Sequence, residues 1–194
     1  MMEARFDIWS WTVLVGLLFL IGRALWVYLP RQYGVSTKPA RPRWIRRAME
    51  LARVRPGETV YDLGAGDGRA LVIAAREFKA RAVGIEIEPL HCLVAWLRAL
   101  LGGVIGRVSI RRRSLLYADL SDADVVFLYL SPDLVEKLRP QFELHLRPGT
   151  RIVSLSFPFE GWQPADMDIG HLIFLYEMPP QPGSLETFLR QSLT

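Results

Sequence analysis

The chain has 194 residues, enough for one domain with a hydrophobic core and one further segment. Apolar residues make up 51% of it and the formal net charge is +4, a basic balance that suits an anionic neighbour such as a lipid surface or a nucleic acid. Its one cysteine, Cys92, excludes an intrachain disulfide, and the scattered residues His91, His145 and His171 give no metal site of recognisable spacing.

An apolar segment opens the chain. Residues 8–29 read IWSWTVLVGLLFLIGRALWVYL, and as a helix they would be about 33 Å long, against a hydrocarbon core of roughly 30 Å. Aromatic residues stand near both ends, and Arg23 lies close enough to the second end for its side chain to reach the headgroups. The segment predicts a transmembrane anchor over residues 1–30. A cleaved signal peptide and a buried core helix are the alternatives.

Basic residues flank this segment on one side. Arg5 alone precedes it, whereas six basic residues follow: Arg31, Lys38, Arg41, Arg43, Arg46 and Arg47. The positive-inside rule then places the remainder of the chain in the cytoplasm, and residues 31–41 are expected to be a basic juxtamembrane linker. We therefore expect a single-pass membrane protein with a cytoplasmic domain, in the inner membrane if the cell is bacterial.

Strands and helices are predicted to alternate from residue 42 to the end. Ile45, Ala48, Met49 and Ala52 share one helical face, which predicts a first helix. Later segments are predicted in the order strand TVYDLG, helix 67–78, strand ARAVGIEI, helix LHCLVAWLRALL, strands RVSIRR and DVVFLYL, a helix from Pro132 broken or kinked at Pro140, and strands RIVSLSF and HLIFLYEM. This alternation predicts an α/β domain over residues 42–194, with a mostly parallel sheet and helices on both faces.

A glycine-rich turn follows the first predicted strand. Glycines permit positive φ and close approach of a ligand, and N–H groups at the start of the next helix favour a carboxylate or phosphate. At the end of the second predicted strand, the Glu86 carboxylate can accept both hydrogen bonds of a ribose diol. The segment 60–69 reads VYDLGAGDGR and holds Asp62, Gly64, Gly66, Asp67 and Gly68.

The residue types in this turn indicate its ligand. A dinucleotide fingerprint, G-x-G-x-x-G/A, would need Gly or Ala at position 69, where the chain has Arg69. A buried acid at Asp62 suits a ligand with an ammonium group, such as the methionine end of S-adenosylmethionine (SAM), and it suits a pyrophosphate badly. An ordinary tight turn between strand and helix is the alternative.

These residues resemble motif I (DLGAGDGR) and the following acidic motif (VGIEIEP) of class I, seven-strand methyltransferases. YLSPDLVEKLRP and LRPGTRIVSLSFPFEGWQP are similar to later motifs of one subgroup, the small single-pass, membrane-anchored protein-lysine methyltransferases. This subgroup includes the mitochondrial enzymes that modify the ATP synthase c subunit and the adenine nucleotide translocase, and related soluble archaeal enzymes methylate many protein lysines. The resemblance extends from about residue 33 to residue 178, and it implies a Rossmann-like domain that uses SAM.

The resemblance also implies roles for single residues. Ser114 stands where the family often has an acid that binds the adenine amine, so the chain departs from the pattern there. The family's Y-V-P-T-P segment is partly matched by YGVST over residues 33–37, where Thr37 is expected to close over SAM. Glu86 would bind the ribose, and the methionine end would be held by the turn, namely Asp62, Gly64, Gly66 and Gly68, with Asp67 among them.

The acceptor side requires alignment and exclusion of water, because methyl transfer from a sulfonium is an in-line displacement. A lysine nucleophile must first lose its proton, and burial beside the sulfonium charge would lower its pKa, so no dedicated base is predicted. Tyr129 and Ser131, at the end of the fourth predicted strand, are the candidates for orienting the amine. Alternatively, Tyr129 is a half-buried strand aromatic and Ser131 an N-cap before Pro132.

Aromatic residues after the fifth predicted strand have two interpretations. Phe157, Pro158, Phe159 and Trp162 either wall a substrate channel or pack in the core and at the sheet edge. The run at residues 111–113, three arginines, is interpreted as a solvated strand end, and no nucleic-acid partner is predicted.

Three functions fit these features. The leading hypothesis is N-methylation of lysine on a membrane or membrane-proximal protein, with SAM as cofactor and no metal. One alternative is methylation of a lipid or lipid-soluble small molecule, which would need a wider acceptor channel. Another is a SAM-binding regulatory or scaffold protein without turnover, which would bind labelled SAM and transfer nothing.

Overall fold

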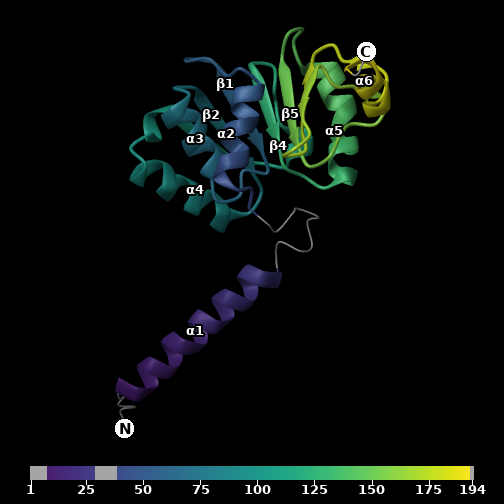
Figure 1. Ribbon diagram of the computed structural model, residues 1–194. Coiled ribbons are helices and arrows are strands. Elements are labelled where there is room, and N and C mark those ends of the chain that lie inside the picture. The colour runs from purple at the N-terminus through teal and green to yellow at the C-terminus, as the bar shows by residue number, and fades with distance from the viewer. Residues whose placement is uncertain (1–7, 29–38, 193–194) are drawn as a thin grey trace. The chain divides into compact units, whose positions relative to one another are not determined.

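A computed structural model of the protein describes residues 8–28 and 39–192 (Figure 1). The chain forms two compact units, Met1–Thr37 and Lys38–Thr194. Residues 31–38 of the predicted linker, with the YGVST segment and Thr37, lie outside the described residues.

The first unit contains helix α1 (Ile8–Tyr28). Across the residues described, no helix combines the length and the apolarity that a membrane crossing needs. The predicted transmembrane anchor is therefore wrong, and so is the single-pass topology with a cytoplasmic domain that was built on it. A physical reason is the short apolar stretch, residues 13–22 between Thr12 and Arg23, which at 1.5 Å per residue is roughly 15 Å long, about half of a hydrocarbon core.

The second unit is built on a seven-stranded sheet whose first five strands are parallel. Antiparallel strands β8 and β7 complete it, which confirms a mostly parallel sheet. In spatial order the strands are β3 (Val108–Arg112), β2 (Arg81–Glu86), β1 (Thr59–Leu63), β4 (Val125–Leu128), β5 (Arg151–Leu155), β8 (Ile173–Glu177) and β7 (Asp166–Asp168). Strands β6 (Trp162–Gln163) and β9 (Gln181–Pro182) form a separate pair.

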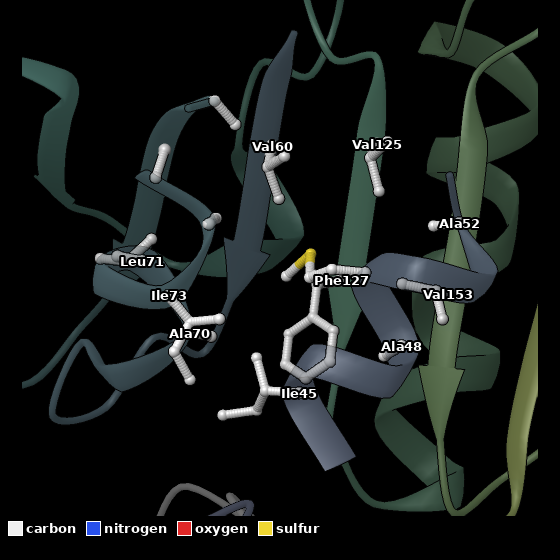
Figure 2. Close-up of a cluster of buried hydrophobic side chains, with 14 of the residues drawn as sticks. Ile45, Ala48, Ala52, Val60, Ala70, Leu71, Ile73, Val125, Phe127 and Val153 are labelled. Atoms are coloured by element: carbon white, nitrogen blue, oxygen red, sulfur yellow. The ribbon is translucent and has the colours of Figure 1, made fainter. Parts of the chain in front are cut away.

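Helices cover both faces of the sheet, as predicted (Figure 1). Helices α2 (Pro42–Leu51), α3 (Arg69–Glu77) and α4 (Pro89–Leu101) lie on one face, and α5 (Pro132–His145) lies on the other. Buried apolar side chains form two cores, one on each face of the sheet. Figure 2 shows the first core, where Ile45, Ala48 and Ala52 pack near Phe127 and Val153 of the sheet. The chain ends in α6 (Leu185–Ser192).

Helix α5 is not broken at its internal proline, so of the two predicted possibilities, a break or a kink at Pro140, the break is wrong. It continues through Pro140 to His145, and Pro140 lies on its exposed side. A proline removes one hydrogen bond of the helix, and on the exposed side water can satisfy the carbonyl that loses its partner.

The strand order fixes where a ligand can bind. Strands β2 and β3 lie on one side of β1, and strands β4 and β5 lie on the other. The register places Leu63 of β1 opposite both Ile85 and Leu128, so the carboxyl ends of the three strands meet at one edge. In open parallel sheets this change of direction opens a crevice at the carboxyl ends, where ligands bind.

Candidate active site

The glycine-rich turn joins the end of β1 to the start of α3. The φ angles are 83° at Gly64, 51° at Gly66 and 75° at Gly68, values that side chains disfavour. At position 68 the space is also taken, because a Cβ built there would lie 2.6 Å from the Cβ of Ala95 on α4. Helix α4 therefore packs directly against the turn, and only glycine fits at position 68.

Glu86 holds the turn from the neighbouring strand. This residue ends β2 and is 4% exposed. Its Oε2 accepts the N–H of Gly66 at 2.8 Å, and its Oε1 accepts the N–H groups of Ile87 and Glu88 at 2.8 and 2.9 Å. Two carboxylate oxygens can accept about four hydrogen bonds, so the carboxylate retains capacity for a ligand hydroxyl.

Asp62 is a buried carboxyl to which no described residue donates a hydrogen bond. It is 5% exposed, and it accepts no hydrogen bond from any residue in the ranges 8–28 and 39–192. Burial, together with the nearby charges of Glu86 and Asp67, raises the pKa of Asp62 to about 8. Because an unpaired buried charge is costly, the site favours a ligand that brings a cation to this carboxylate. The ammonium group at the methionine end of SAM fits this requirement.

Asp67 is engaged by two arginines rather than left free for a ligand. Its Oδ2 lies 2.6 Å from Nη2 of Arg69 and 2.9 Å from Nη2 of Arg98 on α4. Burial raises the pKa of Asp67, but the hydrogen bonds and charge of Arg69 and the charge of Arg98 outweigh it, so the pKa is lowered overall. Nη1 of Arg69 also donates to the carbonyl of Ala40 at 3.1 Å. Asp67 thus joins the turn to α4 and, through Arg69, to the chain just before α2.

Sequence reasoning did not find this network. In the sequence, Arg69 stands out only as a departure from the dinucleotide fingerprint, and Arg98 carries no recognisable signal. An arginine directly after D-G in the turn could have indicated the pair with Asp67. The contact of Asp67 with Arg98 depends on how α4 packs, which no local pattern in the sequence shows.

Ser114 follows the end of β3, on the same edge of the sheet. It precedes the short 3-10 helix at residues 115–117, is partly exposed, and makes no side-chain capping bond. The N–H of the preceding residue, Arg113, donates to the carbonyl of Glu86 at 3.1 Å, which keeps the end of β3 beside the end of β2. Ser114 is therefore close in the fold to the predicted ribose-binding residue.

The end of β4 brings Tyr129 and Ser131 to the crevice. Leu130 between them is buried, and its Cδ2 lies 3.1 Å from a Cβ built on Gly64, so this segment contacts the glycine turn. Tyr129 is partly buried, and Ser131 takes the N-cap position of α5 with no side-chain capping bond. Neither hydroxyl has a hydrogen-bond partner among the described residues, which leaves both available to a ligand.

The residues that follow β5 lie partly in the core and partly near the crevice. Phe159 and Trp162 are buried and stack on one another with their ring centroids 4.6 Å apart, and both contact the ring of Tyr176. These two aromatics therefore pack in the second core and do not wall a channel. Phe157 remains partly exposed, just after Ser156, whose φ is 78°. A strained residue at the carboxyl end of a central strand is typical of ligand sites.

Comparison with protein-family models gives a match to the ANTKMT methyltransferase domain over residues 62–166. This range begins at Asp62 and includes the glycine turn, Glu86, Ser114, Tyr129 and Ser131.

Two characterised relatives and one solved structure show how far the similarity extends. A protein-lysine N-methyltransferase of Saccharolobus islandicus is 37% identical over 77% of this chain and 95% of its own length. The adenine nucleotide translocase lysine N-methyltransferase of Mus musculus is 35% identical over 70% of this chain, which spans 59% of that relative. An RNA methyltransferase from Salinibacter ruber, solved with S-adenosyl-L-homocysteine, superposes with a TM-score of 0.72 at 38% identity, over 76% of this chain and 97% of that one.

Proposed function

The chain belongs to the family of the ANTKMT methyltransferase domain, and on that premise we propose that it transfers the methyl group of SAM to lysine side chains of a protein. The observation that carries the proposal is the match to a protein-lysine N-methyltransferase over 95% of that relative's length. SAM is the cofactor of this family, and the neighbouring Salinibacter ruber structure holds its demethylated product.

The residues of the crevice suit the parts of SAM. Asp62 would pair with the ammonium group, the N–H groups of the glycine turn would bind the carboxylate, and Glu86 would accept from the ribose hydroxyls. Ser114, beside Glu86, is proposed to contact the adenine. When bound, SAM supplies an electrophilic methyl group on a sulfonium.

On the acceptor side, we assign Tyr129 and Ser131 to orienting the lysine amine. Both hydroxyls are unpaired among the described residues, and they stand at the end of β4, which contacts the glycine turn through Leu130. A hydroxyl that accepts one amine proton leaves the nitrogen lone pair free to point at the methyl carbon. The partly exposed Phe157 would add an apolar wall, and an apolar surrounding favours the neutral amine that must attack.

A second candidate acceptor is RNA, because the Salinibacter ruber protein that this chain covers almost completely is an RNA methyltransferase. The finer proposal that the acceptor protein lies at a membrane is supported by an exposed apolar face on α4, described below.

The test is a transfer assay with the purified full chain, tritiated SAM and an extract of its own cells that includes the membranes. Products are separated into protein, organic-phase and RNA fractions, and the labelled protein is hydrolysed and analysed for methyl-lysine. We expect label in protein as methyl-lysine, and none with an Asp62→Ala, Glu86→Ala double variant. Label confined to RNA or to the organic phase would reject the lysine acceptor. Binding of SAM with no label in any fraction would favour the non-catalytic alternative.

A further inference from the structure

Helix α4 carries its large apolar side chains on the outside. Its buried residues are only Ala95 and Ala99. Six large apolar side chains on the same helix are between 42% and 86% exposed, and no described residue of the second unit covers them: Leu90, Leu93, Trp96, Leu97, Leu100 and Leu101. We call these six residues the α4 face.

The α4 face is continuous. At 100° per residue the six side chains fall within an arc of about 140°, on the side of the helix opposite Ala95 and Ala99. An arc of this width matches the apolar stripe by which a helix ordinarily packs on a core, but here it points away from the sheet.

Packing within the domain does not require these side chains. Helix α4 is held against the glycine turn by the close contact of Ala95 with Gly68, which depends on small residues. Single exposed leucines are common on protein surfaces, whereas a contiguous patch of this kind marks a surface that something else covers.

Arginines stand at both ends of the α4 face. Arg107 ends the 3-10 turn that follows α4 and donates to the carbonyl of Lys79 at 3.1 Å. Near the start of α4, Arg112 and Arg113 donate to the carbonyls of Ile87 and Tyr117, both at 3.4 Å. All three arginines are exposed, and none forms an ion pair with a carboxylate in the part of the chain that the structure describes. Their charges are therefore available to an anionic partner.

We propose that the α4 face docks on an anionic lipid bilayer, with its apolar side chains at the acyl boundary and the three arginines at the lipid phosphates. A helix with an apolar arc and flanking cations lies in the plane of the interface, and such docking needs no membrane-crossing segment. Trp96 stands at the margin of the arc, and tryptophan favours the interface. The docking brings the domain to the surface of a membrane and so deepens the proposed function, on which its biological role rests.

Two other occupants fit the α4 face less well. A second copy of the chain paired face to face would set unpaired arginines against the same arginines of the other copy, which is unfavourable. An RNA would satisfy the arginines but leave five leucines in water, because leucine offers no stacking surface to bases.

A local fluorescence reporter tests the docking directly. In a Cys92→Ser background, an environment-sensitive fluorophore is attached to the thiol of a Leu97→Cys variant or, as the matched control, a Leu144→Cys variant. Leu144 lies on α5 and is 78% exposed. On adding vesicles of phosphatidylcholine with roughly one third phosphatidylglycerol, we expect the emission at position 97 to shift to the blue and that at position 144 to stay unchanged. Equal behaviour at both positions would overturn the proposal.

Variants of the full chain then measure separately what the apolar side chains and the arginines contribute to vesicle binding. Leu93→Glu with Leu97→Glu is expected to weaken vesicle binding by about tenfold or more, against less than about twofold for Leu144→Glu. Arg112→Glu with Arg113→Glu should weaken binding to the anionic vesicles and change binding to pure phosphatidylcholine little.

The remaining outcomes identify the other occupants. A blue shift at position 97 that depends on protein concentration without vesicles, or that RNA produces and vesicles do not, would overturn lipid docking in favour of a second copy or of RNA. Because the reporter needs neither SAM nor an acceptor, failure of the docking is distinguishable from failure of methyl transfer.

Discussion

Asp62 is the residue on which we expect cofactor selectivity to depend. Its pKa is raised to about 8, first by burial and then by the charges of Glu86 and Asp67. Because the folded-state pKa exceeds the ordinary value of 3.8, the stability associated with this group is fully present below that value and is lost as the pH rises toward 8. Without its cofactor the domain should therefore become less stable from mildly acidic to mildly alkaline pH.

Replacement of Asp62 by asparagine should reveal how much stability the buried carboxylate costs. We expect Asp62→Asn to increase the free energy of unfolding of the cofactor-free protein near pH 8 by a few kcal/mol, since each pKa unit corresponds to about 1.4 kcal/mol. The gain should shrink near pH 5, where the wild-type carboxyl is largely protonated. Urea unfolding at the two pH values measures this change in the free energy of unfolding. SAM binding by the variant should be lost. An equal effect at both pH values would contradict the raised pKa.

A second prediction at the scale of single residues concerns the hydroxyls of Tyr129 and Ser131. Tyr129→Phe and Ser131→Ala should lower kcat by about 10- to 100-fold, because each removes a hydroxyl that we propose to orient the amine, and leave the Kd for SAM within about twofold. Replacing an N-cap serine usually costs about 1 kcal/mol, but Ser131 makes no side-chain capping bond, so the stability loss should stay under about 0.5 kcal/mol. Transfer kinetics and urea unfolding separate the two readouts, and a large stability loss with an unchanged rate would show a purely structural serine.

Sequence reasoning could group the residues of the proposed cofactor site because their signal is local. Asp62 and the glycines lie within one short segment, and Glu86 ends the next predicted strand. It could not decide between channel and core for Phe159 and Trp162, because burial depends on their contacts with Tyr176, which is remote in the chain. The role of Asp67 was likewise hidden, since Arg98 reaches it from another helix.

At the scale of the element, the long and periodic segments were predictable and the short polar ones were not. Strands β1, β2, β4 and β5 are buried almost throughout, so their apolar runs stand out in the sequence. Strand β7 consists of Asp166, Met167 and Asp168, and it is a strand only because β8 pairs with it. The prediction for the segment of α1 is wrong because the aromatic and basic residues around it are typical of a membrane helix, whereas its apolar stretch is short.

The contact between α4 and the glycine turn gives a prediction with an internal control. Gly68→Ala should destabilise the protein by roughly 2–4 kcal/mol, because it adds a clash with Ala95 to the strain of a positive φ. Gly66→Ala has the same backbone problem, but the nearest atom to its Cβ lies at 3.9 Å, so we expect a loss of about 1–2 kcal/mol. Urea unfolding of both variants is the measurement, and equal losses would show that α4 yields to the added methyl group.

At the scale of the whole molecule, cofactor binding and the α4 face should be independent. SAM at about 100 times its Kd should stabilise the protein by about 2.7 kcal/mol and raise Tm by roughly 5–10 °C. Asp62→Ala should abolish the increase, whereas Leu93→Glu with Leu97→Glu should leave it intact, because the α4 face points away from the crevice. Thermal unfolding with and without SAM measures both, and loss of the increase in the α4 variant would show that the helix is needed to form the site.

The two edges of the sheet bear on how the protein avoids aggregation. An edge strand presents unpaired backbone groups on which another chain can template a strand. Edge strand β3 ends in arginines that face water, and edge strand β7 is short and carries Asp166 and Asp168. Neither edge is a long, flat, apolar row, so fibre growth by strand addition is disfavoured at both ends of the sheet. We therefore expect a concentrated solution of the protein to form amorphous aggregates through its exposed leucines rather than fibres. The precipitate should give no thioflavin signal.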